Sequence, residues 1–148
     1  MYNNTNIKKF HINDIDKIRI DFYNNMKNED KRNELYKIEN DILEKGQEEY
    51  YKYVDKTKLK TDYWSYVIGN RICNFRKGLF PTRKIILKPI SNIWIEFFNI
   101  SKITNLDWRE IIEEYKDNEK AFIYLDPPYL NSFNNNYNQY IFQQMKIK

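Results

Sequence analysis

The sequence has few of the residues on which several common kinds of site depend. Its one cysteine, Cys73, excludes an internal disulfide and a zinc site built from cysteines. The three glycines, Gly46, Gly69 and Gly78, are scattered, so no Gly-x-Gly turn opens a helix. No run of about 18 apolar residues occurs and the amino-terminal residues are polar and charged. We therefore expect no membrane span, no secretory signal and an intracellular protein.

The composition suits one globular domain. Hydrophobic residues make up 41% and charged residues 31% of the 148 positions, which is ordinary for a folded protein of this size. The formal net charge of +4 is modest, but its sign suits a polyanionic partner such as nucleic acid.

Apolar residues recur at steps of three and four in the first half of the chain, and this spacing predicts helices. One helix is expected from residue 12 to about residue 27, with Asn13 or Asp14 as its cap. A second contains the apolar side chains of Leu35, Ile38, Ile42 and Leu43 and stops near Gly46. Residues 48–54 are expected to add another turn or two of helix.

Residues 63–75 are the most apolar and aromatic stretch of the first half, and we expect a buried helix that packs against the first two. Its residues Tyr63, Trp64, Tyr66 and Val67 are interpreted as core and not as a platform for bases. The one histidine, His11, precedes the first predicted helix, so we assign it a capping or surface role instead of a catalytic one.

A cationic cluster follows, around a glycine and a proline. It consists of Arg76, Lys77, Arg83 and Lys84. Because glycine and proline interrupt helices, this segment is expected to form a basic loop or hairpin. Lysine and arginine here would contact the phosphates and bases of nucleic acid. The alternative is a basic loop that is merely solvated.

The last third of the sequence predicts an α/β arrangement. We expect a helix over residues 93–100, a short strand over residues 102–106, and an acidic amphipathic helix over residues 108–115. The apolar run AFIYL, residues 121–125, is typical of a buried parallel strand. Strand, helix and strand in this order imply a parallel pair with a right-handed crossover.

The tetrapeptide Asp126-Pro127-Pro128-Tyr129 directly follows AFIYL, at the place where ligand chemistry occurs in open α/β sheets. The prolines hold the backbone extended, so that its carbonyls point in set directions. Methylating an exocyclic amine of a base requires acceptors for the amine hydrogens, and a carboxylate with a proline carbonyl can provide them. Tyr129 could stack on a flipped base. The alternative is an ordinary strand-ending turn.

The run IYLDPPYL, with Ser132, Tyr137 and Tyr140 after it, resembles the catalytic loop of the Dam-type adenine-N6 DNA methyltransferases. Weaker similarities extend the resemblance to residues 12–142. Asn105-Leu106-Asp107-Trp108 resembles the family's Asp-Phe element, residues 18–24 its Leu-Arg-x-x-Phe-Asn helix, and Gly78-Leu79-Phe80 its Gly-x-Phe hairpin. The sequence departs from the family's Phe-Asn-x-Pro continuation at Phe80-Pro81-Thr82-Arg83.

The resemblance implies roles for particular residues. Asp126, Pro127, Pro128 and Tyr129 would form the catalytic loop and hold the flipped adenine. Asp107 and Trp108 would contact the adenine ring of the methyl donor, S-adenosylmethionine, and Asp126 would also belong to the cofactor site. The basic cluster of Arg76, Lys77, Arg83 and Lys84 would contact DNA. No metal is implied. Asp107 also has a structural interpretation as a helix cap that forms a capping box with Glu110, and Trp108 has one as a core residue.

The resemblance also implies a division of the chain and a gap in it. Residues 1–90 would be a mainly helical target-recognition region, and residues 91–148 a partial Rossmann-like catalytic region. The family's Phe-x-Gly turn and its ribose-binding acidic residue are not recognisable in the sequence. We therefore expect an internal fragment that is poorly stable alone or depends on a second chain carrying the missing half.

Three functions follow as hypotheses. The first is transfer of a methyl group from S-adenosylmethionine to adenine N6 in DNA, by a cytoplasmic enzyme or by one that a virus or phage encodes in its host. The second is the same reaction on RNA. The third is an inactive remnant that binds nucleic acid weakly and does not bind the cofactor.

Overall fold

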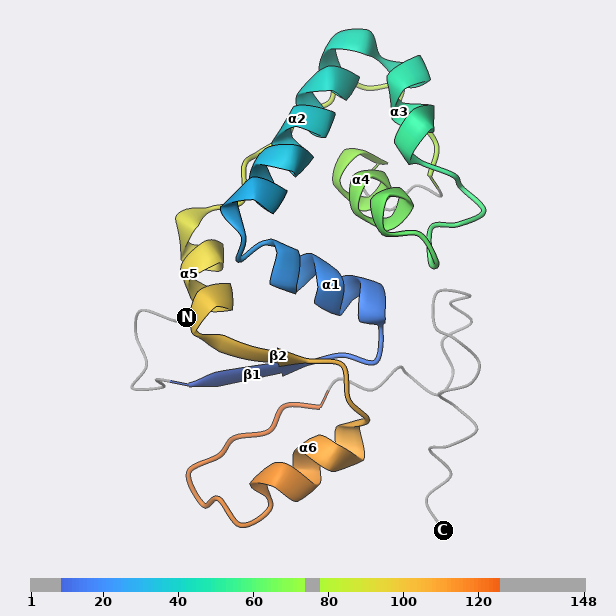
Figure 1. Cartoon of the computed structure of the whole chain (residues 1–148). Coiled ribbons are helices and arrows are strands. Elements are labelled where there is room, and N and C mark those ends of the chain that lie inside the picture. The colour runs from blue at the N-terminus through green and yellow to red at the C-terminus, as the bar shows by residue number, and fades with distance from the viewer. Residues whose placement is uncertain (1–8, 74–77, 126–148) are drawn as a thin grey trace. The chain divides into compact units, whose positions relative to one another are not determined.

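The computed structural model describes residues 9–73 and 78–125. Within these ranges the elements follow one another as mixed strands and helices (Figure 1). They are β1 (Phe10–Asn13), α1 (Lys17–Asn25), α2 (Glu29–Lys45), α3 (Gln47–Tyr53), α4 (Tyr63–Cys73), α5 (Asn92–Ile100), β2 (Ser101–Thr104) and α6 (Trp108–Tyr115). The chain forms two compact units that divide between Glu113 and Glu114, and each is described by itself. No helix in the described ranges is long and apolar enough to cross a membrane.

A two-stranded parallel sheet joins the two ends of the first unit. β1 pairs with β2 in a register that places Phe10 opposite Ser101 and Asn13 opposite Thr104. Helices α1 to α5 form the connection between the strands (Figure 1). The prediction of α/β structure with parallel strands is therefore confirmed at this coarse level. The pairing also joins residues on both sides of the boundary expected near residue 90.

The partner of β2 differs from the sequence prediction. We expected residues 121–125 to be the second strand, but they form no strand, and Phe122 and Tyr124 are 87% and 76% exposed. An apolar run becomes a buried strand only where another strand completes its hydrogen bonds. The described part of its own unit, residues 114–125, contains no strand.

The first predicted helix begins later than expected. Residues 10–13 belong to β1, and α1 starts only at Lys17. Asp16, not Asn13 or Asp14, is the cap: its side chain accepts from the amides of Ile18 and Arg19. The apolar side chain of Ile12 fits either a helix or a strand, and the pairing with β2 decides the outcome.

The other predicted helices are confirmed within a few residues. Helix α2 is capped by Asn28 and ends at Gly46, whose φ of 77° suits a glycine. Helices α3, α4, α5 and α6 occupy the segments expected of them. A basic loop or hairpin was predicted around residues 76–84, of which residues 78–84 are described. These residues and the following segment up to residue 91 are irregular and contain no strand.

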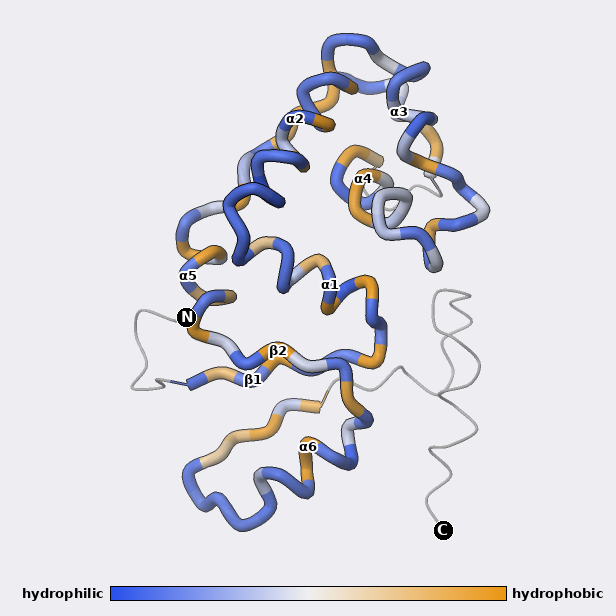
Figure 2. Tube along the Cα trace, in the orientation of Figure 1, coloured by the Kyte–Doolittle hydropathy of each residue, from blue (hydrophilic) through white to orange (hydrophobic). Residues whose placement is uncertain are grey.

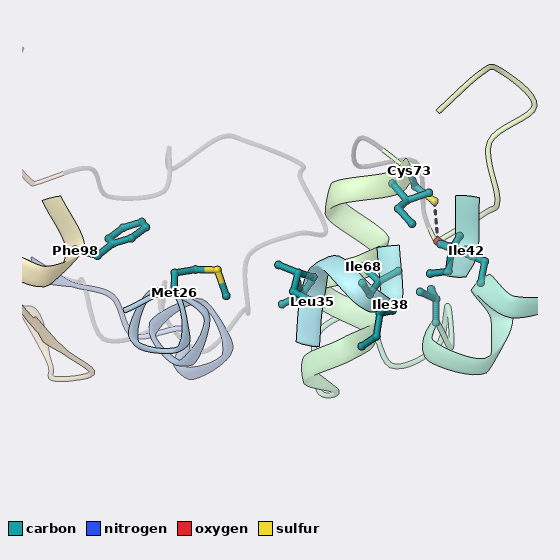
Figure 3. Close-up of a cluster of buried hydrophobic side chains, with 11 residues drawn as sticks. Met26, Leu35, Ile38, Ile42, Ile68, Cys73 and Phe98 are labelled. Carbon is teal, nitrogen blue, oxygen red and sulfur yellow. Dashed lines mark hydrogen bonds between the residues drawn. The ribbon is translucent and has the colours of Figure 1, made fainter. Parts of the chain in front are cut away.

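The core of the first unit lies among the helices. Figure 2 shows hydrophobic residues concentrated in α4 and α5, whereas α2 is mainly hydrophilic. Side chains of α2 and α4 supply most of the buried cluster (Figure 3), and α1, α3 and α5 contribute to it. In α4, Val67 is buried, and Tyr63, Trp64 and Tyr66 pack against the cluster, as predicted for a core segment.

A buried ion pair connects α2 with α4. Arg71 donates from Nε and Nη2 to the two carboxylate oxygens of Glu39, which is only 4% exposed. Nη2 of Arg71 also donates to the carbonyl of Lys88 at 3.0 Å. Loss of one partner from such a pair leaves an uncompensated charge in the interior, so Arg71 holds both helices and the irregular segment in register.

The thiol of Cys73 lies in the same core. Its Sγ is 2.7 Å from the hydroxyl of Tyr50 and donates to the carbonyl of Leu79 at 2.6 Å. Burial raises the pKa of Cys73, an effect that the hydrogen bond to Tyr50 partly offsets. Burial also raises the pKa of Tyr50, and the hydrogen bond to Cys73 adds to this.

These pKa shifts predict the reactivity and the alkaline stability of the fold. The native state holds the Cys73 proton more tightly than the unfolded chain does. The protonated thiol therefore stabilises the fold below the ordinary thiol pKa, and this stabilisation is lost as pH rises through the raised pKa of the native state.

At pH 8, iodoacetamide should modify Cys73 roughly tenfold or more slowly in native than in urea-denatured protein. Above pH 9 the urea concentration at the midpoint of unfolding should decrease as pH rises, and it should decrease less steeply for Cys73→Ala. Equal alkylation rates would contradict the burial of the thiol.

Candidate functional site

The predicted site residues divide into two groups. Asp126, Pro127, Pro128 and Tyr129, with Arg76 and Lys77, lie outside the described residues. Asp107, Trp108, Arg83 and Lys84 lie within them. Ser132, Tyr137 and Tyr140, which supported the resemblance, are also outside the described ranges. The site must therefore be built from the carboxyl ends of the two strands.

The side chain of Asn13, the last residue of β1, bonds to the backbone beyond β2. Its Nδ2 donates to the carbonyl of Leu106, and its Oδ1 accepts from the amide of Leu106, both at 2.9 Å. The same Oδ1 accepts from the Thr104 hydroxyl at 2.8 Å. The carboxamide thus extends the strand pairing by one further step and holds residues 105–107, which lead into α6.

A histidine completes this network. The Thr104 hydroxyl has a single hydrogen, which it donates to Asn13. Its contact of 2.7 Å with Nε2 of His11 must then be one in which the histidine donates. His11 is therefore a half-buried residue of β1 with a structural hydrogen bond, and the predicted capping or surface role was wrong.

Asp14 directly follows β1, at the edge where ligands bind in open α/β sheets. Its carbonyl accepts from Nδ2 of Asn105 at 2.7 Å, so the loops after β1 and β2 are tied together. Its carboxylate accepts from the amide of Asp16 at 2.9 Å and from Arg19 Nη1 at 2.6 Å. A carboxylate has about four acceptor positions, and these two contacts leave capacity for a ligand.

The sequence analysis considered Asp14 only as a possible cap of the helix predicted from residue 12. The ribose-binding acidic residue of the family was not recognised anywhere in the sequence. The structure instead places an acidic residue immediately after a parallel strand. The available signal was the run FHIN before Asp14, which is short enough to be a strand and alternates aromatic or aliphatic with polar residues.

Arg19 holds Asp14 in place from α1. Its Nε donates to the hydroxyl of Tyr66 in α4 at 3.5 Å. Burial lowers the pKa of Arg19, but the hydrogen bond to Tyr66 and the charge of Asp14 outweigh it, and the pKa is raised. Arg19 is therefore a permanent cation that links the strand end to the helical part of the unit.

Asp107 begins α6 with a capping box. Its Oδ1 accepts from the Arg109 amide at 2.9 Å, and Glu110 Oε1 accepts from the Asp107 amide at 3.2 Å. The structural interpretation of Asp107 is thus confirmed. Its Oδ2 also pairs with Nη1 of Arg109 at 2.9 Å. Capping and ligand binding remain compatible, because the carboxylate has further lone pairs.

Trp108 is not a core residue. Its side chain is 36% exposed, and the guanidinium carbon of Arg109 lies 4.9 Å from the centroid of its ring. The core interpretation of Trp108 was therefore wrong. An indole that is partly exposed near the end of a strand is able to pack on a flat ligand.

Arg83 and Lys84 are exposed in the irregular segment, as a basic loop requires. The segment is anchored nearby by Phe80, whose amide donates to the Tyr51 hydroxyl at 3.3 Å and whose ring meets that of Tyr50 edge-on at 5.5 Å. The hairpin form of the prediction does not occur within residues 79–91.

A cavity of about 280 Å³ lies elsewhere, between α2 and the irregular segment. Its lining consists of Tyr36, Glu39, Asn40, Leu87, Lys88 and Pro89. It contains none of the predicted site residues. Among the described residues no group of three or more His, Cys, Asp or Glu side chains is placed to hold a metal ion.

No family model, curated protein or solved structure matches this chain. The functional argument therefore depends on the residues and their geometry.

The network of Asn13 predicts a specific loss of stability. Asn13→Ala removes the partner of the Leu106 amide and carbonyl, and should lower the free energy of unfolding by about 1–3 kcal/mol. Asn24→Ala, the same change at an exposed position in α1, is the matched control and should have little effect. Urea unfolding and the rate of hydrogen exchange at the Leu106 amide are measured for both variants. Unchanged exchange at Leu106 in Asn13→Ala would refute the network.

Proposed function

We propose that this chain forms the acceptor side of a Dam-type adenine-N6 methyltransferase that acts on DNA. The observation that carries the proposal is the tetrapeptide Asp126-Pro127-Pro128-Tyr129 after the apolar run AFIYL. In this proposal, β1 and β2 belong to a partial Rossmann-like methyltransferase sheet, and the helices before α5 belong to a target-recognition region.

The strand ends support a nucleotide-like ligand at this edge. Asp14 follows β1, Asp107 follows β2, and the bond from Asn105 to the Asp14 carbonyl joins the two loops. Acidic residues at the carboxyl ends of parallel strands suit ribose hydroxyls or a base amine, because both are donors. The hydrogen bonds that form this edge join residues about ninety positions apart. They therefore support a binding edge independently of the short sequence motif.

S-adenosylmethionine would supply the methyl group. The chain's own residues fit its nucleoside half: Asp14 offers acceptors for ribose hydroxyls, Asp107 an acceptor for the adenine amine, and Trp108 an exposed ring for packing. The carboxylates of Asp14 and Asp107 each have an arginine partner, Arg19 and Arg109, which holds each carboxylate in place at its strand end.

In the proposed acceptor site, Asp126 and the carbonyl of Pro127 accept the hydrogens of the target amine. The nitrogen lone pair would then bond to the methyl carbon as the bond between that carbon and the sulfonium sulfur breaks, its electron pair staying on sulfur, and one amine hydrogen would leave as a proton through these acceptors. Tyr129 stacks on the extruded base and offsets part of the cost of flipping, which is about a few kcal/mol. Pro128 keeps the backbone after the strand extended.

The glycine-rich cofactor turn is not found in these 148 residues. We propose that a further polypeptide segment supplies it. Completion of the sheet by that segment would also give residues 121–125 the strand neighbours that they require.

A second candidate function is nucleic-acid binding without transfer. The exposed, irregular state of residues 121–125 favours it, because a catalytic loop needs a rigid support to position its acceptors.

The transfer reaction has a direct test. The chain is mixed with the glycine-rich, cofactor-binding half of a Dam-type enzyme, and N6-methyladenine in duplex DNA is measured by mass spectrometry. Asp126→Ala should lower transfer about a hundredfold or more, and the matched control Asp117→Ala, at an exposed turn, should not. Retained turnover in Asp126→Ala removes Asp126 from the mechanism. Transfer to structured RNA in preference to DNA would instead favour the RNA hypothesis.

Calorimetry separates the two candidates. The isolated chain should not bind S-adenosylmethionine measurably, but the reconstituted mixture should, and Asp14→Asn together with Asp107→Asn should weaken that binding about tenfold or more, as expected for lost hydrogen bonds to charged groups. Asp41→Asn, in α2, is the control. DNA binding without any cofactor binding in the mixture would decide for the second candidate.

A further inference from the structure

Leu59 packs against two glycines, Gly69 in α4 and Gly78. A Cβ atom added at Gly69 would lie 2.9 Å from Cδ2 of Leu59. One added at Gly78 would lie 3.1 and 3.2 Å from the two methyl carbons of Leu59, and 3.2 Å from Cα of Lys56. The absence of a side chain at both glycines therefore lets Leu59 lie close to α4 and to the start of the described basic segment.

The loop that carries Leu59, residues 55–61, has its own internal hydrogen bonds. We refer to it as the lysine loop. Asp55 Oδ1 accepts from the amide and the hydroxyl of Thr57 at 2.8 and 2.6 Å. The amide of Asp55 donates to the hydroxyl of the buried Ser65 in α4 at 3.0 Å. The loop is therefore a fixed turn attached to α4, and not a free linker.

Three lysines of this loop, Lys56, Lys58 and Lys60, are exposed, while Leu59 between them is partly buried. Lys58 pairs with Asp55 at 3.5 Å, with side chains 62% and 45% exposed. An exposed pair of this kind is weak, so Lys58 stays available to a stronger anionic partner. The anchoring of Leu59 thus presents lysine ammonium groups to solvent from a rigid turn.

Both segments that adjoin at Leu59 are cationic. Residues 52–62 contain four lysines and two aspartates, and residues 78–84 contain Arg83 and Lys84 and no acidic residue. Each segment thus has a net charge of +2, which suits a polyanionic partner.

We propose that the lysine loop, with residues 78–84 beside it, is a contact surface for the phosphate backbone of duplex DNA. This inference rests on the proposed function for the choice of DNA as partner. Lysine is a point charge that suits phosphate positioning and carries no base preference. Membrane binding would require exposed apolar side chains beside the charges. Within the lysine loop the large aliphatic residue, Leu59, is turned toward α4 and Gly78, whereas Leu79 after Gly78 is 50% exposed, so anionic vesicles are included in the test.

The test uses the full chain and a fluorescent 20-base-pair duplex, with affinity measured at several salt concentrations. The variant K56Q/K58Q/K60Q should weaken binding about tenfold or more near 0.1 M salt, and should lower the slope of log affinity against log salt by about 2 to 3, at roughly 0.9 per lost contact. The matched control K17Q/K31Q/K37Q removes the same charge from exposed positions on α1 and α2, and should leave the slope within about one unit.

Circular dichroism melting verifies that both variants fold like the wild type. The proposal is overturned if both triple variants lose the same duplex affinity, because the charge would then act without a defined surface. It is also overturned if K56Q/K58Q/K60Q binds the duplex as tightly as the wild type. Absence of salt-dependent duplex binding by the wild-type chain also overturns it. Preference for single-stranded RNA or for anionic vesicles over the duplex overturns the assignment of the partner. None of these outcomes involves methyl transfer, so failure here and failure of the proposed function are distinguishable.

Discussion

The parallel pairing of β1 with β2 is the constraint on which the rest of the first unit depends. It joins residues about ninety positions apart in the sequence, so the five intervening helices must pack as one closed connection. The same pairing creates an edge at which the strand ends of the two segments meet. Asn13 extends the pairing beyond the strands, because its side chain bonds to the amide and the carbonyl of Leu106 as a backbone partner would. Without β1, neither Asp14 nor the loop after β2 would have a defined position.

Polar contacts then transmit this arrangement to the helices. Arg19 connects Asp14 to Tyr66 in α4, and Arg71 connects α4 to Glu39 in α2 and to the irregular segment. Each arginine bonds to two different segments and so fixes their relative positions, which apolar packing alone would allow to shift. The candidate ligand edge and the basic surface therefore belong to one unit, although they use different residues and would serve different parts of a nucleic-acid reaction.

The helices were predictable, because their determinants are local. The spacing of Leu35, Ile38 and Ile42 and the stop at Gly46 lie within a few turns of one another. The capping box of Asp107 and Glu110 is also a local pattern, and the sequence alone offers it as an alternative. The strands were harder to predict. Residues 121–125 are entirely apolar and residues 10–13 alternate with polar residues, but only residues 10–13 find a partner strand among the described residues. A strand's hydrogen bonds are made by residues that its own sequence does not contain.

The amino-acid sequence by itself determined the helical segments, the sites of concentrated charge and the tetrapeptide from which the proposed chemistry derives. Only the tertiary structure decided that β2 pairs with the amino-terminal strand, that His11 is a hydrogen-bond donor within the sheet, and that Asp14 follows a parallel strand. It also decided that Gly78 lies beside Leu59, which brings residues 55–61 next to the start of the second cationic segment. The reason is physical: helices are closed by bonds four residues apart, whereas sheets, buried ion pairs and close backbone contacts depend on which distant segments the core brings together.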